Sequence, residues 1–559
     1  MLKSRLCIAF FAFAVGCAPA QKPLTDYVNP MLGTATLWDS VDLGFKPTKR
    51  TWGAEVFPGS SLPNAMVQVS PVTKFHSGAG YQYEDSVIYG FTHTNKGHWN
   101  LCHIPLLPVT GTPTPGDYCS PFSHERESAA PGYYQVFLDR YGVDAQLSST
   151  LRCAFHKYTY PAGAAASLLA DLQRSNEHVR AWDIRKEGDN VFAGWQQTGE
   201  KMYFYAVANR PVTGIEPVVE GDREVRIVRF GEGDGALELR IGFSFVSEKN
   251  ARENLEAEML GKSFAEVRSE ATATWNDLLG RIRVEGGTER EKGLFYSSLY
   301  RSFLWPALRS DVNGEFTDVD GKVINPGFRY YTGPSYWDDY RNKLILLGML
   351  APDVAADVIS SDTDKGEKRG GFMPTFFHGD HASAFVAGTY LRGNRGFDVN
   401  RAYNLVLRNA TVQGPSRPWL DEYIAKGYIS EMDVENPVTW TVCKAAVTKT
   451  LEYSYDDYAV ALLADALGDK ENRDMLMKRT SNYKNLFDPS TGLMRGRLEN
   501  SEWITPFDDQ YPYYEYMYRE ANAWQQAFFA PHDTEGLIGL FPSREAFGEQ
   551  LDKLFRSEE

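Results

Sequence analysis

Hydrophobic positions follow a period of two over the first half of the chain. Apolar side chains occupy alternate positions in short runs such as 143–147 and 237–245, with polar residues between them. This alternation is typical of half-buried antiparallel strands. Pro131-Gly132 and the glycine-rich run 231–235 lie where turns between such strands are expected. The pattern predicts an N-terminal β-sandwich, to which we assign residues 21–249.

The period changes to three and four residues near residue 250. From Phe264 to Ile282, apolar residues recur at helical spacing, which predicts an amphipathic helix. Two capping boxes, in which a hydroxyl side chain is followed three residues later by a glutamate, mark helix starts: Ser263 with Glu266, and Thr288 with Glu291. We therefore predict a helical linker at 250–285. Helical segments alternate with long loops over 286–559, which favours a helical barrel.

Length and composition agree with this multidomain β + α class. A chain of 559 residues exceeds what one hydrophobic core usually supports, so two or more domains are expected. The hydrophobic share of 43% and the charged share of 23% are typical of an ordered globular protein. The net charge of −15 argues against nucleic acid or an anionic membrane as a partner.

The first residues have the pattern of an export signal. Two basic residues precede an apolar run at 6–15, which is too short to span a bilayer as a permanent anchor. Ala18-Pro19-Ala20 fits a cleavage site, whereas Cys17 is a candidate for a lipid anchor, and both endings stay open. We assign 1–20 to a signal peptide. The expected location is the periplasm, the outer membrane as a lipoprotein, or the extracellular space, and no later stretch predicts a transmembrane span.

The remaining cysteines, Cys102, Cys119, Cys153 and Cys443, are widely spaced and form no CxxC pair. A disulfide between two of the first three is compatible with export. Burial of the thiols as small apolar side chains is an equally well supported alternative.

Several common chemistries leave no signature in this sequence. There is no GxxxxGK[ST] phosphate loop, no GxSxG nucleophile elbow and no HExxH zinc helix. The nearest metal-like cluster is His378-Gly379-Asp380-His381, whose spacing fits no standard zinc pattern. A turn with a helix cap is the favoured interpretation of that cluster.

Carboxylates stand beside aromatic residues in four segments: 336–341, 451–458, 503–515 and 518–525. Sugar hydrolysis uses this pairing, because aromatic faces stack on a pyranose and apolar surroundings keep a carboxylic acid protonated. The helical spacing of Tyr455, Asp456 and Tyr458 instead favours a core with a solvated or capping carboxylate. For Asp338 and Glu520, catalysis and structure both stay open, with a helix residue beside a core as the structural alternative for Glu520.

Motifs spread over nearly all of the chain resemble the exo-acting α-mannosidases of glycoside hydrolase family 92. The matching stretches, in order, are DYVNPMLGT at 26–34, FPGSSLPNAMVQVSP at 57–71, GFTHTNKGHWNLCHIPLLPVTG at 90–111, PGYYQVFL at 131–138, YWDDYR at 336–341, TLEYSYDDYAVALLADALG at 450–468, YKNLFDPSTGLMRGR at 483–497 and EANAWQQAFFAPHD at 520–533. The resemblance implies an N-terminal β-sandwich, a helical linker and an (α/α)6 barrel with the pocket between the domains. It also implies calcium-dependent removal of terminal α-linked mannose from glycans, most often α-1,2-linked, with inversion.

The resemblance assigns roles to individual residues. Glu520 matches the general acid, although Ala521 stands where the family motif has glycine. Trp337 and Asp338 match a substrate loop, in which the carboxylate is expected to bind mannose hydroxyls. Trp99 is the candidate for closing the pocket over the sugar. The remaining matched positions are expected to orient Glu520 or only to hold the helix: Asn522, Trp524, Gln525, His532 and Asp533.

Two segments of the family pattern have no match in this sequence. The family's paired general-base aspartates and its Asn-Glu-Pro-rich calcium stretch have no match here, and the metal ligands are therefore not assigned. We expect an (α/α)6 barrel that is incomplete at the C-terminus. Asp508-Asp509 is a weak candidate for a substitute base, because a base must hold a water on the side of the sugar ring opposite the acid. The alternative function is a catalytically impaired or inactive fragment that binds mannose-containing glycans.

Overall fold

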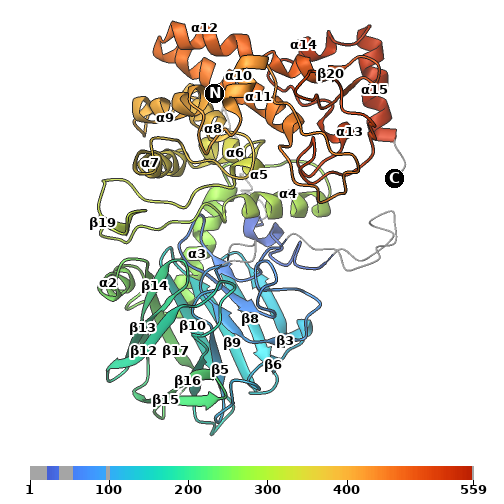
Figure 1. The fold of residues 1–559 in the computed structure, drawn as a ribbon. Helices are drawn as coiled ribbons and strands as arrows, with labels where there is room; N and C mark the ends of the chain where they lie inside the picture. Colours follow the sequence, from blue (N-terminus) through green and yellow to red (C-terminus); the bar gives the residue numbers. More distant parts are fainter. Residues whose placement is uncertain (1–21, 37–54, 96–100, 234, 557–559) are drawn as a thin grey trace, which may run out of the picture.

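The computed structural model describes residues 22–36, 55–95, 101–233 and 235–556. A β-rich N-terminal domain lies below a helical C-terminal domain, and α4 runs across the boundary between them (Figure 1). The predicted order of a sandwich, linker helices and a helical domain is therefore confirmed. The predicted signal peptide, Cys17 and Trp99 lie outside the described residues.

The β domain, in its described residues, contains a seven-stranded and an eight-stranded antiparallel sheet. The seven strands in spatial order are β1 (Ser60–Ser61), β2 (Gln68–Val72), β4 (Gly90–Thr92), β5 (Leu106–Val109), β11 (Ser167–Ala170), β16 (Arg223–Phe230) and β15 (Val212–Glu220). The eight strands in spatial order are β12 (Ala181–Gly188), β13 (Val191–Gln197), β14 (Lys201–Ala208), β17 (Leu237–Ser244), β10 (Cys153–Thr159), β9 (Val143–Ser149), β8 (Tyr133–Leu138) and β7 (Glu127–Ala130).

Short ribbons and helices complete the described structure. The ribbons pair β3 (Val87–Ile88) with β6 (Ser120–Pro121), β18 (Phe316–Thr317) with β19 (Val323–Ile324), and β20 (Phe487–Asp488) with β21 (Leu493–Met494). The helices are α2 (Glu248–Glu258), α3 (Phe264–Leu279), α4 (Glu289–Ser302), α5 (Tyr336–Asp339), α6 (Lys343–Leu350), α7 (Pro352–Lys368), α8 (Ala382–Leu391), α9 (Val399–Thr411), α10 (Leu420–Lys426), α11 (Ala446–Leu467), α12 (Lys470–Arg479), α13 (Ala523–Gln526), α14 (Thr534–Ile538) and α15 (Arg544–Arg556). Three 3₁₀ turns are η1 (Leu24–Tyr27), η2 (His124–Arg126) and η3 (Asn482–Leu486).

The alternating sequence pattern produces the sandwich core directly. In β17, Leu237, Leu239 and Ile241 are fully buried while the residues between them are partly exposed. Side chains of a strand point to opposite faces in turn, so a period of two places one set in the core. Both predicted capping boxes are present at the starts of α3 and α4.

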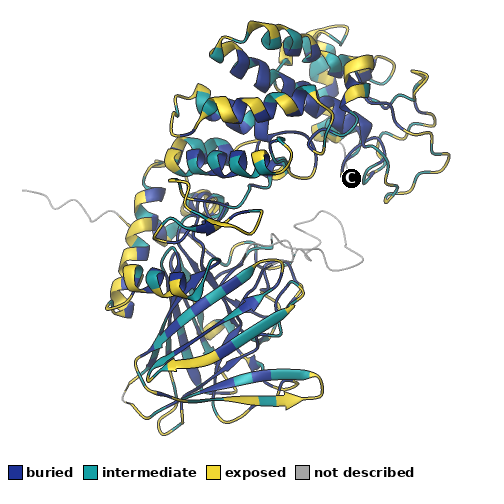
Figure 2. Cartoon of the chain, turned by 60° about the vertical axis from the view of Figure 1, so that its left-hand side comes forward, coloured by how far each residue is buried: buried dark blue, intermediate teal, exposed yellow. Residues whose placement is uncertain are grey.

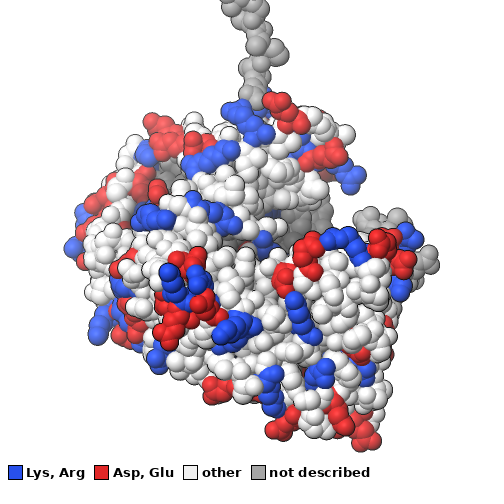
Figure 3. Space-filling view, turned by 90° about the horizontal axis from the view of Figure 1, so that it is seen from above, with Lys and Arg blue, Asp and Glu red and all other residues white. Residues whose placement is uncertain are grey.

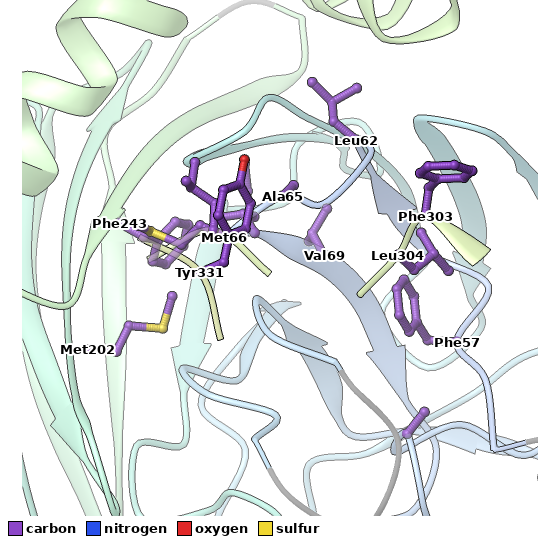
Figure 4. Close-up of a cluster of buried hydrophobic side chains, with 14 of the residues drawn as sticks. Phe57, Leu62, Ala65, Met66, Val69, Met202, Phe243, Phe303, Leu304 and Tyr331 are labelled. Atoms are coloured by element: carbon purple, nitrogen blue, oxygen red, sulfur yellow. The ribbon is translucent and has the colours of Figure 1, made fainter. Parts of the chain in front are cut away.

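The linker helices join the sandwich to the helical domain. Trp275 of α3 is fully buried, and its indole N–H donates to the Ser61 carbonyl at 2.7 Å. The same ring packs on Tyr300 of α4 with 4.4 Å between ring centres. Phe303 and Leu304 follow α4 and lie in the same hydrophobic cluster as the sandwich residues around them (Figure 4). One continuous core therefore spans the domain boundary.

Helix α11 lies at the centre of the helical domain, where it packs against α8, α9 and α12. Across the helical domain, buried residues face inward between the helices and exposed residues lie on the outer faces (Figure 2). Most of the 22 residues of α11 are buried, on all sides of the helix. A helix that is buried on every side is expected to be apolar, yet α11 buries several charged side chains. Ion pairs with residues of other elements compensate the buried aspartates at the centre of the domain.

No single helix among the described residues is long and apolar enough to cross a bilayer, while α6 and α7 pass that test of length and composition only as a pair bent by 118°. Lysine, arginine and acidic side chains are interspersed over the face seen in Figure 3. Within the described part of the chain, the four cysteines considered for disulfides are all free, and Cys102 and Cys153 are buried. The disulfide alternative is therefore wrong for these residues.

Two buried histidines meet between the sheets. The Nδ1 atom of His93 lies 2.9 Å from the Ile104 carbonyl, which can only accept, so Nδ1 carries the proton. The free Nε2 of His93 then accepts from Nε2 of His156 at 3.0 Å. Nδ1 of His156 in turn accepts from the Tyr158 hydroxyl at 2.6 Å. Both imidazoles are neutral in this chain of hydrogen bonds, and a further proton would set N–H against N–H.

We expect acid to destabilise the sandwich through this pair. Burial lowers the pKa of His93 to about 3 and that of His156 well below its usual value. The unfolded histidines titrate near roughly 6.5, so the unfolded chain binds more protons below that pH. The free energy of unfolding should fall as the pH drops from about 6.5 toward 3, by up to about 1.4 kcal/mol per pH unit for each histidine. Urea unfolding between pH 7 and pH 4.5 measures this slope, and His156→Gln should make it shallower. Equal slopes in the variant and the parent would contradict the assignment.

Candidate active site

A loop at 512–521 covers the N-terminal end of α11. The first amides of a helix lack partners within the helix, and main-chain carbonyls of this loop accept them. The amide of Ala445 donates to the Glu515 carbonyl at 2.8 Å, and that of Val447 donates to the Met517 carbonyl at 2.9 Å. The Arg519 amide donates to the Thr448 hydroxyl at 2.8 Å. The loop that carries Glu520 is thereby held against the central helix of the domain.

Glu520 itself is exposed on this loop. Its backbone has a φ of 46°, and its amide donates to the Tyr514 carbonyl at 2.9 Å. Helix α13 begins only at Ala523, so the alternative of a helix residue beside a core is wrong. The neighbouring Tyr516 and Tyr518 are buried in the cluster beneath the loop. The expected apolar surroundings are therefore packed away from the Glu520 carboxylate, which faces solvent in this chain.

Five planar side chains lie in a continuous series next to Glu520, and we call them the planar stack: Trp337, Phe377, Arg519, Tyr514 and Trp440. The Trp337 and Phe377 ring centres are 5.2 Å apart, and the Arg519 guanidinium lies 3.6 Å from the Phe377 ring centre. The same guanidinium lies 4.4 Å from the Tyr514 ring centre, which is 4.8 Å from that of Trp440. The Trp337–Phe377 pair is edge-to-face and the Tyr514–Trp440 pair is tilted; ring pairs in such arrangements, and a guanidinium over a ring, attract one another at these separations. The planar stack links Trp337 of α5 to the loop that carries Glu520.

A buried carboxylate orients Trp337. The indole N–H donates to Oε1 of Glu452 at 3.0 Å. Nε2 of His381 lies 3.7 Å from the same oxygen, and Nδ1 of His381 donates to Asp456 at 2.9 Å. Burial by itself would lower the pKa of His381, but Asp456 and Glu452 outweigh it and raise the pKa to about 10. The protonated ring stabilises the fold below roughly pH 6.5, and that contribution is lost as the pH rises through about 10.

A second network of hydrogen bonds and ion pairs holds Arg519 in place. Arg519 pairs with Glu515, and Nε2 of His378 lies 3.2 Å from the same carboxylate. Nζ of Lys449 donates to Nδ1 of His378 at 3.2 Å. Burial, with Lys449 and Arg519 nearby, lowers the pKa of His378 to about 2, while burial lowers the pKa of Lys449 to about 8. A neutral histidine thus links a lysine to the carboxylate that holds Arg519.

The carboxylates of segment 451–458 are buried in ion pairs. Asp456 and Asp457 of α11 are fully buried, which corrects the prediction of a solvated or capping carboxylate. The fully buried Arg417 donates to Asp380 at 3.0 Å and to Asp457 at 2.6 Å. Arg479 also pairs with Asp457 at 2.9 Å. Burial costs a charge several kcal/mol unless partners compensate it, and these partners come from outside the helix.

The other matched residues mainly hold the short helices. Asn522 and Gln525 form a capping box at the start of α13, and the Trp524 indole donates to Asp509 at 3.1 Å. His532 donates to the Thr480 carbonyl at 2.8 Å. Asp533 caps α14 and accepts from the Tyr483 hydroxyl at 2.9 Å. The structure places none of these contacts on the planar stack. Asp338 is exposed on α5 beside Trp337, and Trp99 lies outside the described residues.

The described residues contain no group of three or more His, Cys, Asp or Glu side chains placed to hold a metal ion. His378 and His381, from the metal-like cluster of the sequence, belong instead to the two networks around α11. A pocket of about 780 Å³ lies between the domains and is lined by residues of both, including Glu200, Arg309 and Lys365. None of the predicted site residues in the described ranges lines this pocket.

Comparison with known proteins identifies the family. The model of the glycosyl hydrolase family 92 N-terminal domain matches residues 27–253, and that of the family 92 catalytic domain matches residues 250–559. The chain belongs to glycosyl hydrolase family 92. It is therefore a glycosidase by family, and both the fold and this assignment agree with the sequence resemblance.

Individual relatives are similar to this family 92 chain over most of its length. The structure of a family GH92 α-mannosidase from Bacteroides thetaiotaomicron matches with a TM-score of 0.86 and 27% identity, covering 96% of this chain and 75% of that one. A family GH92 inverting mannosidase from Bacteroides thetaiotaomicron VPI-5482 shares the fold, with a TM-score of 0.83 and 24% identity over 95% of this chain and 74% of that one. An uncharacterized secreted glycosidase of Arthroderma benhamiae is 25% identical over 614 residues, covering 95% of this chain and 74% of that protein.

Several residues of the planar stack, and the carboxylate that supports it, were not among the predicted site residues. Phe377, Arg519, Tyr514 and Trp440 complete the planar stack, and Glu452 orients its first ring. Glu452 and Arg519 lie within or next to the aromatic-rich segments, which is a usable signal. Phe377 and Trp440 lie outside the matched motifs, and their exposure is visible only in the structure.

Proposed function

We propose that this chain is an exo-acting α-mannosidase that removes terminal α-linked mannose from glycans with inversion, and that α-1,2 linkages are its main substrates. The main support is the match over 96% of the chain, at 27% identity, to an α-mannosidase of the same family. The arrangement beside Glu520 is compatible with that chemistry, because a carboxyl group and aromatic rings lie near one another. The substrate is a mannose-containing glycan, and no nucleic acid partner is proposed.

In the proposed mechanism, Glu520 is the general acid and protonates the glycosidic oxygen as the bond to the leaving group breaks. Trp337 provides an aromatic face for the sugar, held in place by Glu452, and Asp338 accepts hydrogen bonds from mannose hydroxyls. Inversion requires a second carboxylate that activates water on the opposite face of the ring, about 6.5–9.5 Å from the acid. We assign no residue of this chain to that base. Trp99 is proposed to close over the bound sugar.

Calcium dependence is a proposal carried by the family resemblance alone. The described residues supply no metal-binding cluster of three or more His, Cys, Asp or Glu side chains. We therefore assign no calcium ligand among these residues. Export is proposed in the same way, from residues 1–20 and from a relative described as secreted, with Cys17 as the candidate lipid anchor.

A release assay with an aryl α-mannoside tests the proposed function. We expect mannose release that is stereochemically inverting, so that proton NMR of the first product shows the β anomer. If calcium supports the transition state, EGTA should lower kcat/KM by about 10²-fold or more, and added Ca²⁺ should restore it. Retention of the α anomer would contradict single displacement, and turnover unaffected by chelator would contradict calcium dependence. Mannose binding without any turnover would favour the alternative of a glycan-binding protein.

A further inference from the structure

Trp440 is exposed to an unusual degree for a tryptophan. Its side chain is 72% exposed, and the flanking Val438 and Val442 are 60% and 64% exposed. The loop is nevertheless ordered by a turn, because the Thr441 amide donates to the Val438 carbonyl at 2.8 Å and the Thr441 hydroxyl accepts from the Val438 amide at 2.8 Å. Tryptophan is usually largely buried. A tryptophan that is held by an ordered turn and still exposes most of its surface indicates a binding role.

The backbone ties this ring to the proposed acid. The Tyr514 amide donates to the Thr439 carbonyl at 2.7 Å, and the Glu520 amide donates to the Tyr514 carbonyl at 2.9 Å. Tyr514 lies between Trp440 and Arg519 in the planar stack. Only one residue, Tyr514, therefore separates the Trp440 loop from Glu520 in this series of contacts.

The planar stack has two ends, with the residue next to Glu520 between them. Trp337 and Phe377 lie on one side of Arg519, and Tyr514 and Trp440 lie on the other. A general acid in glycoside hydrolysis acts on the oxygen between the departing sugar and its leaving group. If Trp337 supports the sugar that is released, the opposite end of the stack lies on the leaving-group side of that bond.

We propose that Trp440 forms a leaving-group subsite, where its exposed face stacks on the sugar ring that remains attached to the glycan. This inference rests on the proposed function. A pyranose ring suits the surface because its C–H face is apolar while its edge carries hydroxyl groups, and Trp440 offers an exposed aromatic face flanked by two exposed valines. Trp440 thus acts as a specificity-determining residue that favours oligosaccharides over mannosides with a small leaving group.

Comparing kcat/KM for two substrates separates stacking of Trp440 on the leaving-group sugar from a loss of catalysis on every substrate. In methyl α-mannoside the leaving group needs a proton from the general acid but has no ring to stack, whereas an α-linked mannobiose places a second sugar on the leaving-group side. Trp440→Ala should lower kcat/KM for mannobiose by about tenfold or more and leave kcat/KM for methyl α-mannoside close to that of the parent. Trp440→Phe should recover most of the loss. Val219→Ala removes a 64% exposed valine from the sandwich and serves as the matched control.

Failure of the subsite and failure of the proposed function give different results. An equal loss on both substrates, or no loss on mannobiose, would overturn the subsite. If the parent chain turns over neither substrate, the proposed function fails, and calorimetric binding then tests Trp440: the alanine variant should bind mannobiose more weakly and mannose equally well. A change from dimer to monomer in Trp440→Ala, seen by analytical ultracentrifugation, would show that a second copy covers this ring and would also overturn the proposal.

Discussion

Replacing Glu520 with glutamine should lower kcat/KM for a mannoside with a poor leaving group by about 10²–10⁴-fold, the usual contribution of a general acid. Glutamine keeps the size and the hydrogen-bonding capacity of the side chain but has no acidic proton to transfer to the glycosidic oxygen. Because Glu520 is exposed and its backbone contact to Tyr514 does not involve the carboxylate, the fold should be unaffected. Steady-state kinetics with methyl α-mannoside or α-linked mannobiose measure the loss.

A substrate with an activated leaving group provides the sharper control. A dinitrophenolate departs without protonation, so Glu520→Gln should be much less impaired on dinitrophenyl α-mannoside than on mannobiose. The exposed Glu499, which lies outside the loop at 512–521, gives a matched Glu→Gln control that should behave like the parent. An equal loss on both leaving groups would assign Glu520 a role other than proton donation.

Replacing Arg417 with methionine should destabilise the helical domain by about 3–5 kcal/mol, the cost of removing one partner from a buried ion pair. Arg417 is fully buried and pairs with Asp380 and Asp457. Methionine fills part of the volume but leaves Asp380 with a stranded charge. Burial already raises the pKa of Asp380 to about 6 even with Arg417 present. Urea unfolding followed by tryptophan fluorescence measures the change.

The origin of this loss can be checked with a second substitution. Asp380→Asn in the Arg417→Met background removes one stranded carboxylate and should restore part of the lost free energy of unfolding. Arg252→Met breaks an exposed pair with Glu256 and should unfold like the parent, because exposed ion pairs contribute little. If Arg417→Met is as stable as the parent, the buried pairs contribute no more than an exposed one.

Local signals in the sequence predicted the architecture because they report local geometry. A period of two at 237–245 places alternate side chains on one face of a strand, and the capping boxes at Ser263 and Thr288 satisfy helix amides within four residues. None of these features depends on distant segments. The family motifs added the order of the domains and drew attention to Glu520 and Trp337.

Distant packing decided what surrounds those residues. The helical spacing around Asp456 predicted a solvated or capping carboxylate. Asp456 and Asp457 are instead buried, and Arg417 and Arg479 reach Asp457 from other elements. No periodicity within α11 can show that a partner arrives from outside it.

The sequence by itself determined the sandwich, the linker helices, the helical domain and a family in which Glu520 is the candidate acid. Only the tertiary structure decided that Glu520 lies on an exposed loop and that Phe377 and Trp440 join it through the planar stack. The physical reason is that strands and helices follow from contacts between near neighbours in the chain. The planar stack depends instead on loops from three separate segments of the chain. Two of these loops hold Phe377 and Glu520 at positive φ angles of 67° and 46°. The packing of the whole domain sets these loop conformations.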